Sequence, residues 1–237
     1  MDQLFDLFNA EAEADVTAPI TAEGVLQLVL ARTAEVPLGE PQSRPRRRVG
    51  KEIFDFCFAL SMVIAVLPSL VFIALAIKLT SRGPVFYRAE RIGQDGKPFR
   101  MFKFRTMYAD ADLDILTARS IKKNTLMFKL SADPRITPVG RFLRKYALDE
   151  LPQFLNVLRG EMSIVGPRPR QTRDVVNRRV LLVKPGITGL WQLSGRDHIS
   201  MEDALRLDLS YVENWSLALD LQLLTKTIGA VVLHNPT

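Results

Sequence analysis

The hydrophobic pattern begins with one long apolar segment. Residues 56–77 form a run of 22 residues without a charge, which is long enough to cross about 30 Å of hydrocarbon as a helix. Pro68 lies near the middle of this run, where a proline removes a backbone donor and clashes with the preceding turn. We therefore expect a helix that is broken at Pro68.

A hairpin is predicted after the apolar segment. Two runs rich in aromatic and β-branched residues lie on either side of the turn dipeptide Asp95-Gly96, which is typical of a β-hairpin. Because side chains alternate along a strand, the second run should carry its aromatic rings on one side and its cations on the other. These residues are Phe102 and Phe104 on the first side, and Lys103 and Arg105 on the second.

Two amphipathic helices are expected further along. The first should begin with Asp149 as its N-cap, carry Pro152 in its first turn and stop at Gly160. The second covers residues 217–231. The apolar positions are Leu151, Phe154, Leu155 and Leu158 in the first helix, and Leu217, Leu221, Leu224, Ile228 and Val231 in the second. Either stripe fits core packing or a lipid surface, and the pattern leaves both open.

Basic residues flank the apolar segment on both sides. They are Arg44, Arg46, Arg47, Arg48 and Lys51 before it, and Lys78, Arg82, Arg88 and Arg91 after it. A spanning helix normally has Lys and Arg enriched on one side only. We therefore expect a re-entrant helix whose two ends lie on the cytoplasmic face. An ordinary spanning helix with a tolerated proline is the alternative.

Charge divides the chain into an acidic arm and a basic body. Residues 1–43 hold eight acids and one base, whereas residues 44–237 hold 31 bases and 18 acids. A basic body indicates an anionic partner, but charge does not distinguish nucleic acid, an anionic lipid surface and a phosphorylated substrate. Cys57 is the only cysteine, which excludes an intrachain disulfide and a thiolate metal site and suits a cytoplasmic face.

These patterns predict a mainly helical α+β protein in three parts. Residues 1–50 are rich in proline without an apolar period, so we expect a disordered acidic arm that ends in a basic run. Residues 51–79 form the re-entrant membrane helix broken at Pro68. Residues 80–237 form a small cytoplasmic catalytic domain with the hairpin and interfacial amphipathic helices. Within it, residues 108–130 are expected to be helical but irregular.

Two segments carry candidate chemistry. In Ser163-Ile-Val-Gly-Pro-Arg-Pro-Arg, two prolines stiffen the backbone around Arg168, and Arg170 adds a second charge. A guanidinium there suits phosphate oxygens, although a solvated turn with surface arginines is the alternative. The adjacent carboxylates of Asp149 and Glu150 follow three cations, Arg141, Arg144 and Lys145. They suit a magnesium ion and an ionised nucleophile, or simply a capping aspartate with a first-turn glutamate.

From Lys51 to about Val232 the chain resembles the bacterial sugar transferase family, the polyprenyl-phosphate hexose-1-phosphate transferases or monotopic phosphoglycosyl transferases. The blocks that carry the resemblance are residues 51–56, 103–107, 148–169, 184–196 and 208–216. They occur in order with none missing, which makes the match specific. One departure is Leu67 before Pro68, where many relatives have a serine.

The resemblance implies a two-step transfer at the bacterial inner membrane. Asp149 would attack the β-phosphate of a UDP-sugar and release UMP, and a polyprenyl phosphate would then take the sugar-phosphate. Magnesium is the implied cofactor, with Glu150 and Asp149 as ligands. The implied substrate-binding residues are Arg144 and Arg168 as phosphate clamps, Asp208 as a supporting carboxylate, Arg170, and, less strongly, Lys103, Arg105 and Arg196.

Two other classes of protein compete with this interpretation. A membrane-tethered nucleic-acid binder would need exposed aromatics among its basic residues and would leave Asp149-Glu150 without a role, so nucleic acid is not an expected partner. A non-catalytic scaffold of a polysaccharide assembly complex would not release UMP. The expected partners are the UDP-sugar, the polyprenyl phosphate and the bilayer, with a homo-oligomer and glycan assembly proteins left open. Trp191 is open to two roles, uracil stacking and anchoring in the membrane interface.

Overall fold

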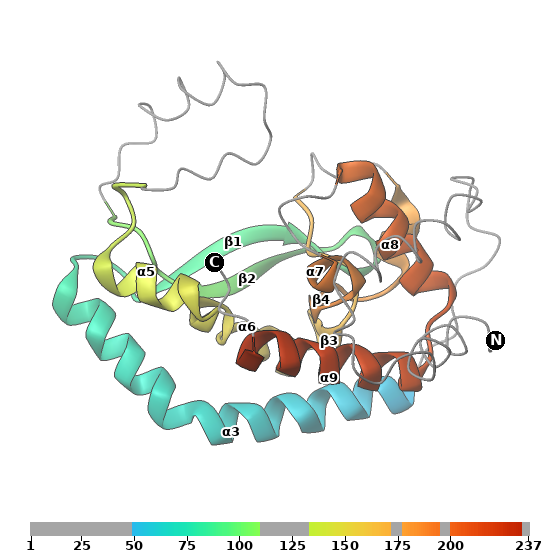
Figure 1. Cartoon of the computed structure of the whole chain (residues 1–237), viewed down its shortest axis with the longest axis horizontal. Helices are drawn as coiled ribbons and strands as arrows, with labels where there is room; N and C mark the ends of the chain where they lie inside the picture. Colours follow the sequence, from blue (N-terminus) through green and yellow to red (C-terminus); the bar gives the residue numbers. More distant parts are fainter. Residues whose placement is uncertain (1–48, 110–132, 172–176, 195–199, 234–237) are drawn as a thin grey trace, which may run out of the picture.

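The computed structural model describes residues 49–109, 133–171, 177–194 and 200–233 (Figure 1). The helices are α3 (Val49–Thr80), α5 (Pro138–Lys145), α6 (Gln153–Leu158), α7 (Leu190–Leu193), α8 (Met201–Glu213) and α9 (Leu217–Leu233), and the short 3-10 helices are η1 (Gln94–Gly96), η2 (Leu148–Glu150) and η4 (Arg178–Leu182). The strands are β1 (Phe86–Ile92), β2 (Pro98–Phe104), β3 (Ser163–Val165) and β4 (Gly186–Thr188).

The mainly helical α+β class is confirmed, with two small two-stranded sheets. Three predictions fall outside the described residues: the disordered arm up to residue 48, the irregular helix for positions 110–130, and the role of Arg196.

The apolar segment forms one helix, α3, which is the only helix of the described chain that is long and apolar enough to cross a membrane. It continues through Pro68 and bends near its middle (Figure 1). The expected break is therefore a bend, because a proline removes one backbone bond while the bonds of the flanking turns persist. Many of its large side chains are exposed, among them Ile64 at 65%, Phe72 at 75% and Leu79 at 84%. So much exposed apolar surface is typical of contact with lipid.

The predicted hairpin is confirmed. β1 and β2 pair antiparallel, and Asp95 and Gly96 in the turn both have positive φ, at 56° and 77°. Phe102 and Phe104 are both buried. Helix α6 docks against the outer edge of β2 through Asn156. Its side chain accepts a hydrogen bond from the amide of Phe102 at 2.9 Å and donates one to the carbonyl of Arg100 at 2.9 Å, so the strand's unpaired backbone groups are satisfied.

The helix expected to start at Asp149 starts later. Asp149 lies in η2, and α6 begins at Gln153 with Pro152 in the N-cap position. Proline has no amide hydrogen to donate to Leu148, and the turns before it close with i to i+3 bonds instead. The prediction that Asp149 caps the helix is therefore wrong. The predicted stop is confirmed, since Gly160 has a φ of 73° just after α6.

A parallel pair, β3 with β4, was not predicted. It depends on close backbone approach between three glycines. A Cβ on Gly166 or Gly186 would overlap the backbone of the other strand, and a Cβ on Gly189 would overlap the carbonyl of Gly166. Only glycine permits this spacing. The sheet places the Gly-Pro-Arg-Pro segment beside residues 184–189, which the resemblance had treated as a separate block.

Two clusters of buried apolar side chains pack α3 against the rest of the described chain. One buried cluster packs Ala59 of α3 against α6, α8 and α9, and a second packs Ile73 and Ile77 of α3 against β2 and α5. In Figure 1, α3 runs beneath the rest of the described chain. The apolar stripe of α9 is buried on one side and exposed on the other. Leu224 is buried, whereas the outward positions are exposed, namely Leu217, Leu221 and Ile228.

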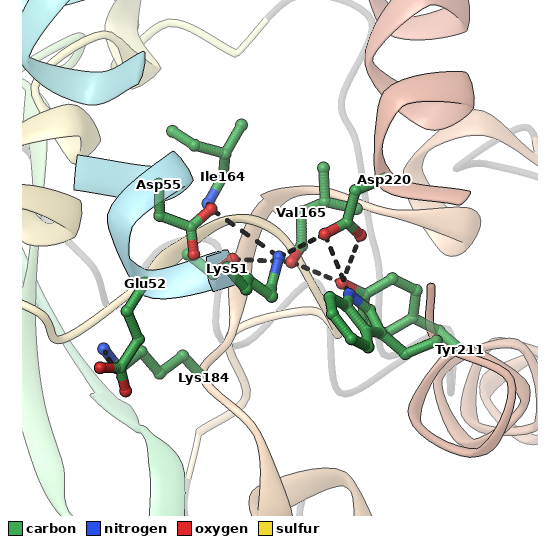
Figure 2. Close-up of polar contacts among 10 residues, drawn as sticks. Lys51, Glu52, Asp55, Ile164, Val165, Lys184, Tyr211 and Asp220 are labelled. Carbon is green, nitrogen blue, oxygen red and sulfur yellow. Dashed lines mark hydrogen bonds and ion pairs between the residues drawn. The ribbon is translucent and has the colours of Figure 1, made fainter. Parts of the chain in front are cut away.

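A buried polar network ties the start of α3 to the domain (Figure 2). Lys51 Nζ lies 2.7 Å from Oδ2 of Asp220, whose side chain is fully buried. Asp220 also accepts hydrogen bonds from the Tyr211 hydroxyl at 2.7 Å and from Trp215 Nε1 at 2.9 Å. Asp55, one turn after Lys51, accepts the amide of Ile164 in β3. The first resemblance block, residues 51–56, thus fixes how α3 enters the domain.

Candidate active site

The carboxylate pair lies beside the open end of the hairpin. Glu150 Oε1 is 2.7 Å from Lys103 Nζ, and both side chains are about three-quarters buried. Lys103 reaches η2 because it alternates with Phe102 and Phe104, which turn to the opposite face of β2. Lys103 is therefore part of the Asp149–Glu150 group, although 47 positions separate it from Glu150 in the chain.

The chain reverses sharply just before the pair. Ala147 adopts the left-handed region with φ 52° and ψ 21°, a conformation that costs a non-glycine residue about 1 kcal/mol or more. It connects the end of α5 to η2. The strained turn keeps Arg144, in the last turn of α5, close enough to act electrostatically on Asp149.

The pKa of Asp149 is raised above its ordinary value, chiefly because burial disfavours the charged carboxylate. Lys103 and Arg144 lower it, and the neighbouring charge of Glu150 raises it further. Arg144 thus favours the ionised form, as expected from the sequence, but burial has the larger effect on the pKa of Asp149. A carboxylate taken out of water is a stronger nucleophile once it is ionised, and a bound cation would favour ionisation.

The residues present fit a magnesium ion. Mg²⁺ is usually held by one or two carboxylates together with substrate phosphates, and Asp149 and Glu150 supply two adjacent ones. Repulsion between them raises the pKa of Asp149, and a divalent cation would relieve it. A larger cage is not found, since the described part of the chain contains no cluster of three acidic, His or Cys side chains suited to a metal.

Two arginines of the predicted set have distinct surroundings here. Arg144 is exposed, and its Nε donates to Thr106 Oγ1 at 2.9 Å. Arg105 is buried, and its Nη2 donates to the carbonyl and hydroxyl of Ser81 at 2.9 and 2.6 Å. Arg105 therefore secures the connection between α3 and β1, and its observed contacts do not include the carboxylate pair.

The other predicted residues form a second group around Asp208 of α8. Its carboxylate is 2.6 Å from Arg170 Nη2 and accepts the backbone amide of Arg168 at 3.3 Å. Burial raises the pKa of Asp208 to about 6, although Arg170 acts to lower it. The Arg168 guanidinium lies 4.1 Å from the ring centroid of Trp191, a cation–π distance. Trp191 is only 6% exposed, so it is not an interfacial anchor, and Arg168 covers one face where uracil would stack.

The two groups are held at different ends of the hairpin. The carbonyl of Arg170 accepts the amide of Ile92 beside the turn, whereas Lys103 lies near the open end. Pro98, opposite Ile92, and Lys103 are five positions apart on β2, or roughly 16 Å at 3.3 Å per residue. Arg144 and Arg168, predicted as phosphate clamps, are thus anchored at opposite ends of the hairpin. In Figure 1, α5 and α8 lie at these two ends.

The amino-acid sequence of the chain is similar to those of known proteins. A profile described as "Bacterial sugar transferase" matches residues 46–234. The chain belongs to the bacterial sugar transferase family. Its relatives include the exopolysaccharide production protein ExoY of Sinorhizobium fredii, which is 42% identical over 204 residues, 81% of this chain and 89% of that protein.

Two further relatives carry names that state a reaction. The undecaprenyl-phosphate galactose phosphotransferase of Salmonella typhimurium is 40% identical over 78% of this chain and 41% of its own length. The UDP-glucose:undecaprenyl-phosphate glucose-1-phosphate transferase of Escherichia coli is 39% identical over 81% of this chain and 42% of its own length. The chain thus spans most of ExoY but less than half of these two sugar transferases.

In this member of the family, sequence reasoning missed an acid–base pair near the site. Asp133 Oδ2 accepts a hydrogen bond from Arg135 Nη2 at 2.8 Å, and Asp133 Oδ1 accepts one from Arg135 Nε at 3.0 Å. These hydrogen bonds are the main cause that lowers the pKa of Asp133, and Arg144 contributes as well. The pair therefore lies within electrostatic reach of Arg144. An Asp-Pro-Arg turn signals a local polar bend, but nothing in its spacing indicates this neighbour.

Proposed function

We propose that the chain transfers a hexose-1-phosphate from a UDP-sugar to undecaprenyl phosphate or a similar polyprenyl phosphate. The products are a polyprenyl-diphosphate-sugar and UMP. One observation carries the proposal: Asp149 and Glu150 lie with Lys103 and Arg144 at one end of the hairpin, in a chain whose relatives are named for this transfer. The relatives named for exopolysaccharide production support a role at the first membrane step of glycan synthesis.

The proposed mechanism has two displacements at one phosphorus atom. A carboxylate oxygen of Asp149 bonds to the β-phosphorus. The bond from this phosphorus to the oxygen that bridges the two phosphates breaks, and UMP leaves with that oxygen and the electron pair. An oxygen of the polyprenyl phosphate then attacks the same phosphorus, and the Asp149 carboxylate leaves. Two easier steps replace one difficult step.

In this proposal the surrounding residues orient the carboxylates and stabilise the charge on the phosphates. Lys103 holds Glu150 through its 2.7 Å ion pair, and the Arg144 guanidinium contacts phosphate oxygens on which charge develops. Glu150 and Asp149 would hold Mg²⁺, which when bound supplies positive charge to the phosphates. Asp208 keeps the Arg168–Arg170 segment in place through its two hydrogen bonds, at the other end of the hairpin from the carboxylate pair.

The proposal predicts that purified protein releases UMP. Repeated turnover should require the lipid acceptor, because the acceptor frees Asp149 for the next cycle. With UDP-glucose or UDP-galactose, undecaprenyl phosphate and Mg²⁺, we expect UMP and a lipid-linked sugar diphosphate in equal amounts, measured by chromatography. Chelation of the metal should stop both. Protein that binds membranes but releases no UMP with any UDP-sugar would favour the scaffold interpretation instead.

We further propose that α3 is re-entrant in the bacterial inner membrane, with the catalytic domain on the cytoplasmic face. The bend in α3, the basic residues on both of its sides and the exposed apolar stripe of α9 support this topology. In a Cys57→Ser background, Glu40→Cys and the control Glu202→Cys should both resist a membrane-impermeant thiol reagent in intact cells and react after permeabilisation. Labelling of Glu40→Cys alone in intact cells would show a spanning helix.

A further inference from the structure

The Arg144 guanidinium is oriented by a neutral group. Its Nε donates to the hydroxyl of Thr106 at 2.9 Å, and no carboxylate of the described residues lies within ion-pair distance of it. Asp133, on which Arg144 also acts electrostatically, already accepts hydrogen bonds from the Arg135 side chain. Arg144 thus differs from Lys103 and Arg170, whose charges face partner carboxylates.

Thr106 is held rigidly where it meets α5. The residue is 6% exposed and directly follows β2 and Arg105. Its carbonyl accepts the amide of Thr137 at 3.0 Å, and Thr137 in turn caps α5 by accepting the amide of Gly140 at 2.8 Å. A Cβ on Gly140 would overlap the backbone of Thr106. The first turn of α5 therefore rests directly on Thr106.

Helix geometry then brings Arg144 to the same side chain. Gly140 and Arg144 are four positions apart, so both lie on the face of α5 that meets Thr106. The backbone contact at Gly140 sets the distance, and the hydroxyl bond at Nε sets the orientation of the guanidinium. A hydroxyl group is neutral, so it orients the guanidinium without offsetting its positive charge. A carboxylate in the same place would offset that charge.

We propose that Thr106 is a positioning residue that orients Arg144 for phosphate binding without forming an ion pair with it. The inference rests on the proposed function, in which Arg144 contacts a substrate phosphate. Residues 103–107 thereby serve the site twice, through Lys103 on Glu150 and through Thr106 on Arg144.

A double-mutant cycle on the full-length protein tests this role. Thr106→Val keeps the shape and the backbone bonds but removes the acceptor. It should lower kcat/KM for UMP release from UDP-glucose or UDP-galactose by about tenfold to a hundredfold, the range expected for a hydrogen bond to a charged group. Thr106→Ser restores the acceptor and should recover most of that loss. In an Arg144→Ala background, Thr106→Val should have less than about a twofold effect.

The outcomes separate this inference from the function on which it rests. An equal fall for Thr106→Val in both backgrounds, or a lowered thermal unfolding midpoint that Thr106→Ser does not restore, would assign Thr106 a purely structural role. A slow Arg144→Ala with a fully active Thr106→Val would overturn the positioning role and leave the proposed function intact. A fully active Arg144→Ala would instead overturn the phosphate contact assigned to Arg144.

Discussion

Asp149→Asn is expected to abolish UMP release while the protein stays folded and bound to membranes. Asparagine keeps the shape and hydrogen-bonding capacity of the side chain but removes the anionic nucleophile, and loss of a nucleophile lowers turnover by at least about a thousandfold. With a radiolabelled UDP-sugar and no lipid acceptor, wild-type protein should release UMP in proportion to enzyme and retain label. The Asn variant should do neither.

Glu150→Gln provides the matched control, since it changes the adjacent carboxylate in the same way. It should weaken the Mg²⁺ dependence and slow the reaction but still allow label to accumulate on the protein, because the residue that forms the bond is unchanged. If wild-type protein traps no label, and UMP appears only with polyprenyl phosphate, a single direct displacement is the better mechanism. Asp149 would then be reassigned as a metal ligand.

Asp220→Ala is expected to cause the largest loss of stability. The Asp220 side chain is fully buried, and its removal leaves Lys51, Tyr211 and Trp215 without their shared acceptor. Breaking a buried ion pair costs about 3–5 kcal/mol, which for a protein of this size corresponds to a fall of about 10 °C in the unfolding midpoint. Thermal unfolding in nanodiscs measures it.

Two comparisons make the stability prediction specific. Glu202→Ala removes an exposed i, i+4 partner of Arg206 on α8 and should change the midpoint by about 1 °C or less. Lys51→Met added to Asp220→Ala should recover part of the loss, because the buried cation that has lost its shorter ion pair is removed as well. An Asp220→Ala variant that unfolds at the same temperature as Glu202→Ala would show that the network in Figure 2 does not hold α3 to the domain.

Local sequence signals predicted the elements whose causes are local. The length and apolarity of α3, the Asp95-Gly96 turn and the stop at Gly160 all depend on residues within a few positions of one another. The bend in α3 was predicted from a single proline, and the helix continues through it. The start of α6 was misplaced because Pro152 was expected in the first turn of the helix, whereas it lies at the N-cap and the 3-10 turn η2 precedes it.

The contacts of the site, by contrast, depend on residues far apart in the chain. Lys103 meets Glu150 and Arg144 meets Thr106 because β2 and α5 pack around Thr106 and Gly140. The raised pKa of Asp149 has the same origin, since burial is a property of the packed domain and outweighs the effect of the neighbouring cations. The pairing of Arg168 with Trp191 across the β3–β4 sheet likewise has no counterpart in local spacing.

By itself, the sequence determined the family, the long apolar helix and the identity of the chemical groups, because motif blocks and hydrophobic patterns can be read from the order of residues in the chain. Only the tertiary structure decided which of those groups share a site. It assigned Lys103 and Arg144 to the carboxylate pair, Arg170 and Arg168 to Asp208, and Arg105 to the α3–β1 connection. The physical reason is that hydrogen bonds, ion pairs and burial act over a few ångströms in space, whatever the separation along the chain.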